Sequence, residues 1–284
     1  MNKNYENLLS LYVHWPYCEA KCPYCDFNSH VNEQIDINQW IKSYKNQLYF
    51  MKDELIEKKI NLQNLNAIFF GGGTPSLMPV EIIEQIINIS SDIYGFKKNI
   101  EITLEANPSS YESKNFVKLK QIGINRLSIG VQSLNNKYLN FLGRSHNIND
   151  VDIVLKEALN TFNNVSVDLI YAFHEQNLLE WTNELENFLK KNNLQHLSLY
   201  QLTIEEGTKF FKDHNNGLIK LIDNDLAAEF YNASDKILND YEFIKYEVSN
   251  YAKKGYKCRH NLSYWNSENW IGIGPGAYGR LWSS

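Results

Sequence analysis

The chain has 284 residues, of which 43% are hydrophobic and 21% charged, and its 28 basic and 33 acidic residues give a formal net charge of −5. That apolar fraction excludes a disordered chain, and the charge balance, without a basic block, argues against a dedicated nucleic-acid binder. No apolar run approaches the roughly 20 residues that span a bilayer. The apolar stretch from Leu8 to Val13 is too short for the core of a signal peptide, so we expect a cytoplasmic protein.

Six short runs rich in β-branched and aromatic residues alternate with longer helical patterns. The predicted strands are residues 11–15, 67–70, 100–104, 126–131, 165–170 and 196–200. Such alternation is typical of βα units around a parallel sheet. Because six units are too few for a closed eight-fold barrel, the predicted fold class is α/β, with a partial, open (β/α)6 barrel.

The predicted helices have recognisable ends. Asp36 suits the cap of a helix that runs to about Lys59, and Pro79 suits the first turn of the next. A third helix is predicted over residues 111–122, ending at Gly123. Further helical patterns cover residues 135–142, 149–162, 178–192 and 222–240.

The pattern changes after about residue 241, where segments rich in tyrosine, tryptophan and glycine begin. We therefore predict a core barrel over residues 1–240 and a small C-terminal part over residues 241–284, read as an added β layer or subdomain. The last residues, 271–284, resemble neither a helix nor a polar tail, so we expect that the chain stops early.

Three of the four cysteines, Cys18, Cys22 and Cys25, stand in one loop after the first predicted strand. Clustered thiols in a chain of this size indicate metal binding or redox chemistry rather than a disulfide framework. Three thiolates converging from a short segment suit a four-iron cluster, and they leave one iron open to another ligand.

Three other interpretations of these thiols stay open. A structural zinc site would need a fourth ligand, for which His14, His30 or Cys258 could serve. Cys22-Pro-Tyr-Cys25 alone matches a glutaredoxin-type dithiol, which would need a βαβ fold of about 100 residues around it. The third is a set of unconnected buried thiols, against which the polar residues of the loop argue.

The segment Tyr12-Val-His-Trp-Pro-Tyr-Cys18, followed by the other two cysteines and Asp-Phe, resembles the radical S-adenosylmethionine (SAM) superfamily. More narrowly, it is similar to the branch that contains oxygen-independent coproporphyrinogen III oxidases and the HemW haem chaperones. Ordered matches follow along nearly the whole chain. The resemblance implies a 4Fe-4S cluster on Cys18, Cys22 and Cys25, with SAM at the open iron.

Glycine or polar residues follow the predicted strands, at the ends where parallel α/β barrels carry their ligand sites. The successive glycines before Thr74, which include Gly72 and Gly73, let a ligand approach the backbone closely, although a plain turn is the alternative. The resemblance implies that this loop binds the amino group of SAM and that Glu105 and Gln132 also contact SAM. For a lone glutamate, a surface carboxylate would be the default interpretation.

Arg144 and Asp168 are the other two polar candidates. A planar guanidinium suits the SAM carboxylate, and in a chain with only four arginines this role is favoured over a solvated surface charge. Asp168 stands in an apolar strand, where burial is costly without partners, which points to a ligand or a buried network. The resemblance also places Tyr12 and Tyr24 beside the cluster and SAM, with simple core packing as the alternative. It fails locally at Ala172-Phe-His174, where the family usually has Gly-Leu-Pro, and this puts the geometry of that loop in doubt.

His260-Asn-Leu-Ser-Tyr264 resembles the H-N-x-x-Y motif of the haem-chaperone branch, which implies that His260 binds haem. Imidazole is a good axial ligand for haem iron, and neighbouring aromatic residues can cover a macrocycle. The alternative is a histidine hydrogen-bonded in an aromatic core. Cys258 is read as structural, with a thiolate haem ligand as its alternative.

Two functions are compatible with this scaffold: the SAM-dependent oxidative decarboxylation of coproporphyrinogen III in porphyrin biosynthesis, and the binding of haem for transfer to haem-accepting proteins. Three features favour the chaperone: Phe27 where the oxidase usually has a fourth cysteine, a cluster that begins already at Cys18, and the motif at His260. A zinc-binding module without enzymatic activity is the third hypothesis.

The chaperone would need an electron donor for its cluster, and transient membrane association stays open. Relatives normally continue into a further C-terminal domain, so the region from residue 241 is expected to be the start of a shortened haem or substrate region.

Overall fold

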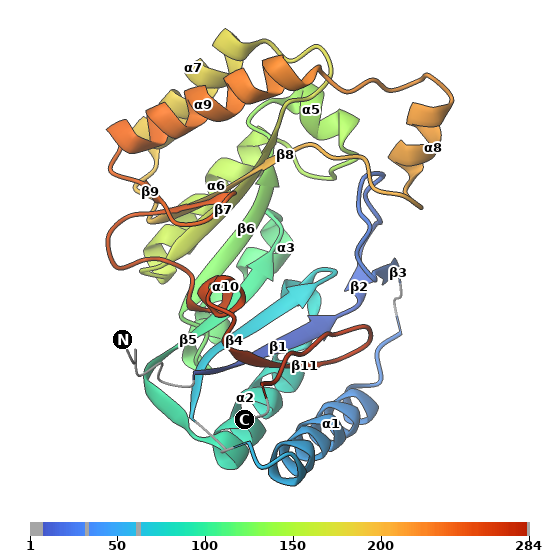
Figure 1. The fold of residues 1–284 in the computed structure, drawn as a ribbon, viewed down its shortest axis with the longest axis vertical. Coiled ribbons are helices and arrows are strands. Elements are labelled where there is room, and N and C mark those ends of the chain that lie inside the picture. Colours follow the sequence, from blue (N-terminus) through green and yellow to red (C-terminus); the bar gives the residue numbers. More distant parts are fainter. Residues whose placement is uncertain (1–7, 32–33, 61–63, 283–284) are drawn as a thin grey trace.

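The computed structural model describes residues 8–31, 34–60 and 64–282. Within these ranges it contains a nine-stranded sheet of order β11-β1-β4-β5-β6-β7-β8-β10-β9 and a separate two-stranded pair, β2 (Tyr17–Cys18) and β3 (His30–Val31). Figure 1 shows the large sheet as a twisted surface, with α1 and α2 at one end and α7 and α9 at the other.

Six neighbouring strands in the middle of the sheet run parallel. They are β1 (Leu9–Trp15), β4 (Leu65–Gly72), β5 (Phe96–Ala106), β6 (Arg126–Gln132), β7 (Val165–Tyr171) and β8 (His196–Gln201). Each of the six predicted runs lies inside one of these strands, so the α/β prediction is confirmed. The outermost strands β11 and β9 do not pair with each other, and the barrel is therefore open.

Helices connect these strands. They are α1 (Ile37–Glu57), α2 (Val80–Tyr94), α3 (Ser110–Ser113), α4 (Phe116–Gln121), α5 (Asn136–Phe141), α6 (Ile148–Thr161), α7 (Leu178–Lys191), α8 (Lys209–Asn215) and α9 (Asn224–Asp240). Asp36 caps α1 by accepting a hydrogen bond from Gln39 N, as predicted. Pro79 is the N-cap of α2 and not part of its first turn, a shift of one residue.

The prediction of one continuous helix over residues 111–122 is wrong, because this segment is divided into α3 and α4. Asn115 N donates to the carbonyl of Glu112, three residues earlier, and this tighter turn interrupts the helical ladder. The short helix α8 has no counterpart among the predicted elements. Among the described helices, none is both long and apolar enough to cross a bilayer.

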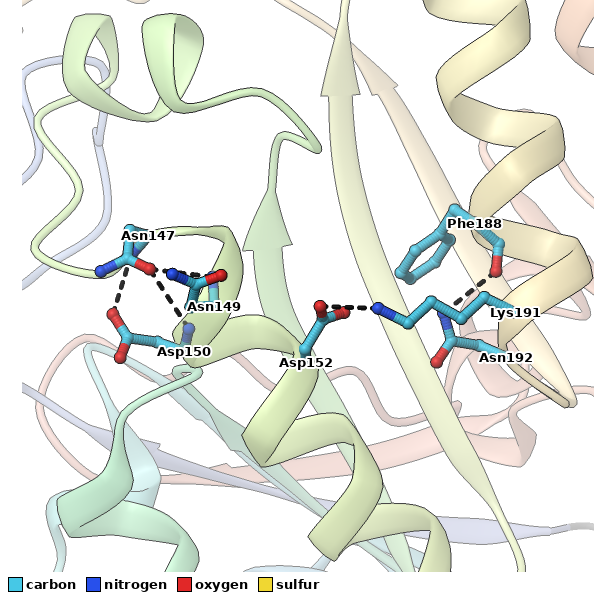
Figure 2. A network of polar contacts seen from close by, with 7 residues as sticks. All are labelled: Asn147, Asn149, Asp150, Asp152, Phe188, Lys191 and Asn192. Carbon is cyan, nitrogen blue, oxygen red and sulfur yellow. Dashed lines mark hydrogen bonds and ion pairs between the residues drawn. The ribbon is translucent and has the colours of Figure 1, made fainter.

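Polar contacts at the surface cap α6, and one ion pair joins this helix to α7 (Figure 2). Asn147 caps α6 in a reciprocal capping box, since its side chain accepts from Asp150 N while the Asp150 carboxylate accepts from Asn147 N at 2.9 Å. Lys191, at the end of α7, pairs with Asp152 of α6 at 2.6 Å. Exposed pairs of this kind contribute under about 1 kcal/mol, so this one adds little to the stability of the fold.

The segment after residue 241 extends the sheet at both of its edges. β10 (Asn250–Ala252) pairs antiparallel with β8 and with β9 (Ile244–Lys245), whereas β11 (Asn269–Ile273) pairs parallel with β1. Between them lies α10 (Arg259–Trp265), which contacts β1 and β4. The expected β layer is thus part of the barrel sheet itself, and a domain boundary at residue 240 stays a prediction.

The parallel strands carry an apolar and a polar face. Along β5, the apolar Ile102 and Leu104 belong to the main core, and they alternate with Glu101, Thr103 and Glu105. The polar residues of neighbouring strands meet across the other face. This interior polar face supplies side chains for the site described below.

Candidate functional site

A cavity of about 580 Å³ lies at the carboxyl ends of the parallel strands, where sites of α/β barrels are found. Eleven of the thirteen predicted site residues line it, and Tyr12 and His260 do not. The eleven are Cys18, Cys22, Tyr24, Cys25, Gly72, Gly73, Thr74, Glu105, Gln132, Arg144 and Asp168. Residues that are separated by up to 150 positions in the sequence are thus brought to one place.

The three clustered thiols are half-buried at the wall of this cavity. Their loop is held by its own backbone, since Cys25 N donates to the carbonyl of Cys22 at 3.1 Å, and by Lys21 Nζ, which reaches the Phe27 carbonyl at 3.3 Å. Burial raises the pKa of the Cys18 and Cys25 thiols, while hydrogen bonds from neighbouring groups oppose this by favouring the thiolates.

Each candidate fourth ligand of the zinc alternative is engaged elsewhere. The ring of His14 bonds to Tyr12 Oη at 3.1 Å and to the Asn28 carbonyl at 2.9 Å. His30 bonds to the Asn28 side chain at 3.1 Å. Cys258 is buried and donates to Glu101 Oε1 at 3.4 Å. The loop itself thus offers three thiols, the number that a four-iron cluster with one open iron would use.

The glycine loop after β4 crosses the backbone of the strand that leads to Cys18. Gly73 N donates to the Trp15 carbonyl at 2.6 Å, and Thr74 N donates to the Tyr17 carbonyl at 2.9 Å. A Cβ on Gly73 would lie 2.7 Å from Tyr17 O, and Gly72 has a φ of +116°, a conformation that favours glycine. The glycines thus serve a close approach to the protein's own backbone, in addition to forming a wall of the cavity.

Two carboxylates face the cavity from β5 and β7. Glu105 accepts a hydrogen bond from Gly72 N at 3.2 Å, and burial, followed by the nearby charge of Asp168, raises its pKa to about 8. Asp168 accepts from Ser128 Oγ at 3.1 Å, and burial raises its pKa as well. The buried Arg126 opposes both shifts electrostatically. Asp168 thus has the polar partners that its apolar sequence context predicts.

Gln132 ends β6 with a φ of +69°, which is uncommon for a residue with a side chain. Its amide lies so close to Gly130 that a Cβ there would be 2.8 Å from Gln132 Nε2. Strained backbone at a cavity wall is common in ligand sites. This geometry adds support to the predicted role of Gln132.

Arg144 links the cavity wall to the cysteine loop. Its Nη1 donates to Cys22 Sγ at 3.4 Å, and its Nη2 donates to Asn107 Oδ1 and, at 3.1 Å, to the Gly130 carbonyl. Its Nε is buried and has no acceptor among the described residues, so this N–H lacks a partner in the structure. Asn107, which also lines the cavity, was not predicted from the sequence.

A second cavity of about 390 Å³ lies beside the first and shares Gly72, Glu105 and Phe27 with it. The remainder of its wall is largely aromatic and consists of Tyr12, His14, Asn28, Tyr264, Trp270, Gly276 and Tyr278. Tyr12 therefore faces this neighbouring cavity. Tyr24, in contrast, lines the first cavity and packs on Phe210 with ring centroids 6.2 Å apart.

His260 is buried, with 1% of its surface exposed, and lines neither cavity. Its Nε2 lies 2.6 Å from Tyr264 Oη, and its ring stacks on Phe69 and Tyr12 at centroid distances of 5.1 and 6.0 Å. Burial, followed by the charge of Arg126, lowers its pKa to about 3, so the ring is neutral. This environment matches the alternative reading, a histidine hydrogen-bonded in an aromatic core.

The loop that departs from the family pattern has a defined geometry. Ala172 adopts a φ of +66°, the left-handed conformation in which glycine is usual. Gln176 Oε1 accepts hydrogen bonds from Ala172 N at 2.8 Å and from Phe173 N at 3.2 Å. The turn therefore forms without glycine, and Asp168 keeps its place in the cavity.

Comparison with known proteins identifies the family of the chain. The family model of the radical SAM superfamily matches residues 12–188. The mouse protein "Radical S-adenosyl methionine domain-containing protein 1, mitochondrial" is 39% identical over 96% of this chain and 60% of its own length. "Heme chaperone HemW" of Buchnera aphidicola is 38% identical and that of Escherichia coli 36% identical, each over 96% of this chain and 70% of its own length.

Among solved structures, the radical SAM enzyme coproporphyrinogen III oxidase (HemN) of Escherichia coli superposes with a TM-score of 0.78 at 20% identity. The match covers 96% of this chain and 65% of HemN, and at this identity it shows the fold alone. The chain thus spans between 60% and 70% of the relatives named above. Because sequence and fold agree along nearly its whole length, the chain belongs to the radical SAM superfamily and, within it, to the HemN-like branch that includes the HemW haem chaperones.

Proposed function

We propose that the chain is a haem chaperone of the radical SAM type, which binds a 4Fe-4S cluster, SAM and haem and transfers the haem to acceptor proteins. The observation that carries the proposal is the meeting of the cysteine loop, the glycine loop and Arg144 at one 580 Å³ cavity. The similarity to HemW chaperones over 96% of the chain supports the choice of chaperone over oxidase.

In this proposal, Cys18, Cys22 and Cys25 hold the cluster. The cluster and SAM together supply one-electron chemistry when bound. Gly72 and Gly73 present backbone to the amino group of SAM, and Thr74 completes this wall. The residues assigned to the remainder of the SAM molecule are Glu105, Gln132, Arg144, Asp168 and Tyr24.

For haem, we propose the neighbouring aromatic cavity, with Tyr12 and Tyr264 against the macrocycle. Aromatic side chains offer the large apolar contact area that a porphyrin needs. His260 would hold the haem iron, and for this its hydrogen bond with Tyr264 has to open, since both rings are packed together here. The partners would be a haem-accepting protein and an electron donor for the cluster, and a transient contact with a membrane would suit a membrane-bound acceptor.

Anaerobic reconstitution with iron and sulfide tests the cluster. We expect about four irons per chain and a four-iron EPR signal after reduction. Cys22→Ala should abolish the signal, whereas Cys258→Ala, which removes the buried thiol bonded to Glu101, should keep it. A chain that acquires only one tightly bound zinc and no four-iron signal would contradict the radical SAM interpretation.

Haem titration then tests the chaperone. We expect His260→Ala to weaken haem binding and change the absorption spectrum of the haem, because the proposed iron-binding imidazole is removed. Tyr264→Phe should keep or strengthen binding, since it frees the imidazole. If His260→Ala binds haem as well as the parent does, the ligand assignment is wrong. Conversion of coproporphyrinogen III to protoporphyrinogen IX by the reconstituted protein with SAM would contradict a role as chaperone alone.

A further inference from the structure

We propose that Asn107 is a positioning residue of the SAM cavity, which holds the Arg144 guanidinium in place and joins it to the glycine loop. The inference rests on the proposed binding of SAM in this cavity. Asn107 follows β5 directly, two residues after Glu105, and lines the cavity between the glycine loop and Arg144.

The side-chain amide of Asn107 uses both of its polar atoms. Its Nδ2 donates to Thr74 Oγ1 at 3.1 Å, and its Oδ1 accepts from Arg144 Nη2. An amide can do this because it carries a donor and an acceptor on one small planar group, whereas a carboxylate has acceptors alone. Asn107 therefore joins two segments that lie about 70 residues apart in the sequence.

The two partners of Asn107 each reach the cysteine loop or the residue before it. Thr74 N donates to the Tyr17 carbonyl, next to Cys18, at 2.9 Å, and Arg144 Nη1 donates to Cys22 Sγ at 3.4 Å. A chain of hydrogen bonds thus runs from Tyr17 through Thr74, Asn107 and Arg144 to Cys22. Asn107 is its central member, so a change there reaches the cysteine loop from both directions.

The backbone of Asn107 is fixed from behind by Glu112, a carboxylate with 1% of its surface exposed. Glu112 Oε2 accepts from Asn107 N at 2.8 Å and from the Ser76 hydroxyl, while Oε1 accepts from Ser109 Oγ at 3.2 Å. Ser76 belongs to the turn that follows the glycine loop. This buried support keeps Asn107 at a fixed distance from Thr74, as the partners of ligand-binding side chains usually do.

A fixed guanidinium favours anion binding because little rotational freedom remains to be lost. Both Nη atoms of Arg144 are held by Asn107, Gly130 and Cys22, which leaves Nε without an acceptor among the described residues. Without Asn107, Arg144 loses one of its three anchors and its orientation toward the cavity becomes variable. The expected consequence is weaker binding of the SAM carboxylate.

The test uses the full chain, reconstituted with its cluster, and measures the Kd of SAM by equilibrium dialysis together with the SAM-induced change in the EPR spectrum. We expect Asn107→Leu to raise the Kd about tenfold, which corresponds to about 1.4 kcal/mol, and to reduce the spectral change at unchanged iron content. Asn125→Leu is the matched control. Asn125 also bridges backbone groups, accepting from Ile102 N and donating to the Ile100 carbonyl, but it precedes β6 at the opposite end of the sheet. The Asn125→Leu variant should lower Tm and leave the Kd of SAM unchanged within about twofold.

A double-mutant cycle with Arg144→Met separates positioning from general structural damage. If Asn107 acts through Arg144, Asn107→Leu adds no further loss of affinity once the guanidinium is absent. Fully additive losses, or an unchanged Kd in Asn107→Leu alone, would overturn the inference. If Asn107→Leu fails to load a cluster, the isosteric variant Asn107→Asp serves instead. Its carboxylate cannot donate to Thr74, and it pairs with the Arg144 guanidinium. The Kd of SAM should then rise at least threefold, and an unchanged Kd overturns the inference. If the parent protein loads its cluster and binds no SAM, the proposed function is overturned as well. If parent and variant both bind SAM normally, only the inference about Asn107 is overturned.

Discussion

Glu105 lies in the wall that the two cavities share, and its protonation links the site to stability. Burial and the neighbouring Asp168 raise its pKa to about 8, compared with about 4.3 in an unfolded chain. At a pH between these two pKa values, Glu105 keeps its proton in the folded protein and releases it in the unfolded chain. Stability is therefore highest below the unfolded pKa and falls as the pH rises through the window toward 8.

Glu105→Gln should remove this pH dependence, because the amide has the same shape and carries no charge. In the full chain without cofactors, we expect the variant to unfold at a higher Tm than the parent near pH 8.5 and at a similar Tm near pH 5. Thermal unfolding followed by circular dichroism measures the difference. Glu157→Gln, at an exposed site on α6, is the control and should show no such trend. An equal effect of Glu105→Gln at both pH values would contradict the raised pKa.

The sequence singled out residues of the cavity wall where the residue type is rare in this chain or unfavourable to bury. The three thiols, Glu105 and Arg144 stand out because a cysteine cluster, a strand-end carboxylate and a scarce arginine each need an explanation. Asn107 gave no such signal, since asparagine is frequent in this chain and its role depends on Thr74 and Arg144, which only the fold brings together. The burial of His260 could not be predicted from its own segment either, because the rings that stack on it come from β1 and β4.

At the scale of elements, α10 is anchored to the barrel interior by a side chain of β5. Glu101 Oε1 accepts from the first helical amide, Arg259 N, at 2.9 Å and from the Cys258 thiol at 3.4 Å. The same carboxylate lies near the fully buried guanidinium of Arg126 and stabilises its charge. Glu101 thus acts both as the cap of α10 and as the counter-charge of Arg126.

Glu101→Leu should lower the free energy of unfolding by about 3 kcal/mol, because it leaves a buried charge without its carboxylate and removes a helix cap. Glu101→Gln should cost less, about 1 kcal/mol, since its amide oxygen still accepts from Arg259 N. Urea denaturation of the full chain measures both values. Arg259→Ala, which removes an exposed contact to the Asn99 carbonyl, is the control with an expected loss under about 0.5 kcal/mol. Equal stability of Glu101→Leu and the parent would contradict this anchoring role.

The length of an element decided how well it was predicted. The six parallel strands were found because each carries a short run rich in β-branched and aromatic residues, and in several of them apolar and polar residues alternate. In contrast, β9 and β10 have two and three residues, too few for a periodic pattern, and their pairing depends on contacts with the distant β8. The division of residues 111–122 was missed because it comes from one backbone hydrogen bond at Asn115.

At the scale of the whole molecule, the segment after residue 241 covers both edges of the parallel core. β10 lies along β8, β11 lies along β1, and α10 contacts the sheet between these edges (Figure 1). Unpaired strand edges expose rows of backbone hydrogen-bonding groups and promote association between chains. These contacts argue that the barrel and the C-terminal segment fold as one unit.

A fragment of residues 1–240 should therefore fail to form a stable monomer. It keeps the six parallel strands but exposes β1 and β8 as bare edges, so we expect aggregation or higher oligomers in size-exclusion chromatography and a broad, non-cooperative thermal transition. A longer fragment of residues 1–266 retains β9, β10 and α10 and exposes β1 alone, so its behaviour should lie between that of the short fragment and that of the full chain. A monomeric 1–240 fragment with a cooperative transition would show instead that residue 240 is a true domain boundary, and that the edge strands only cover a barrel that is stable without them.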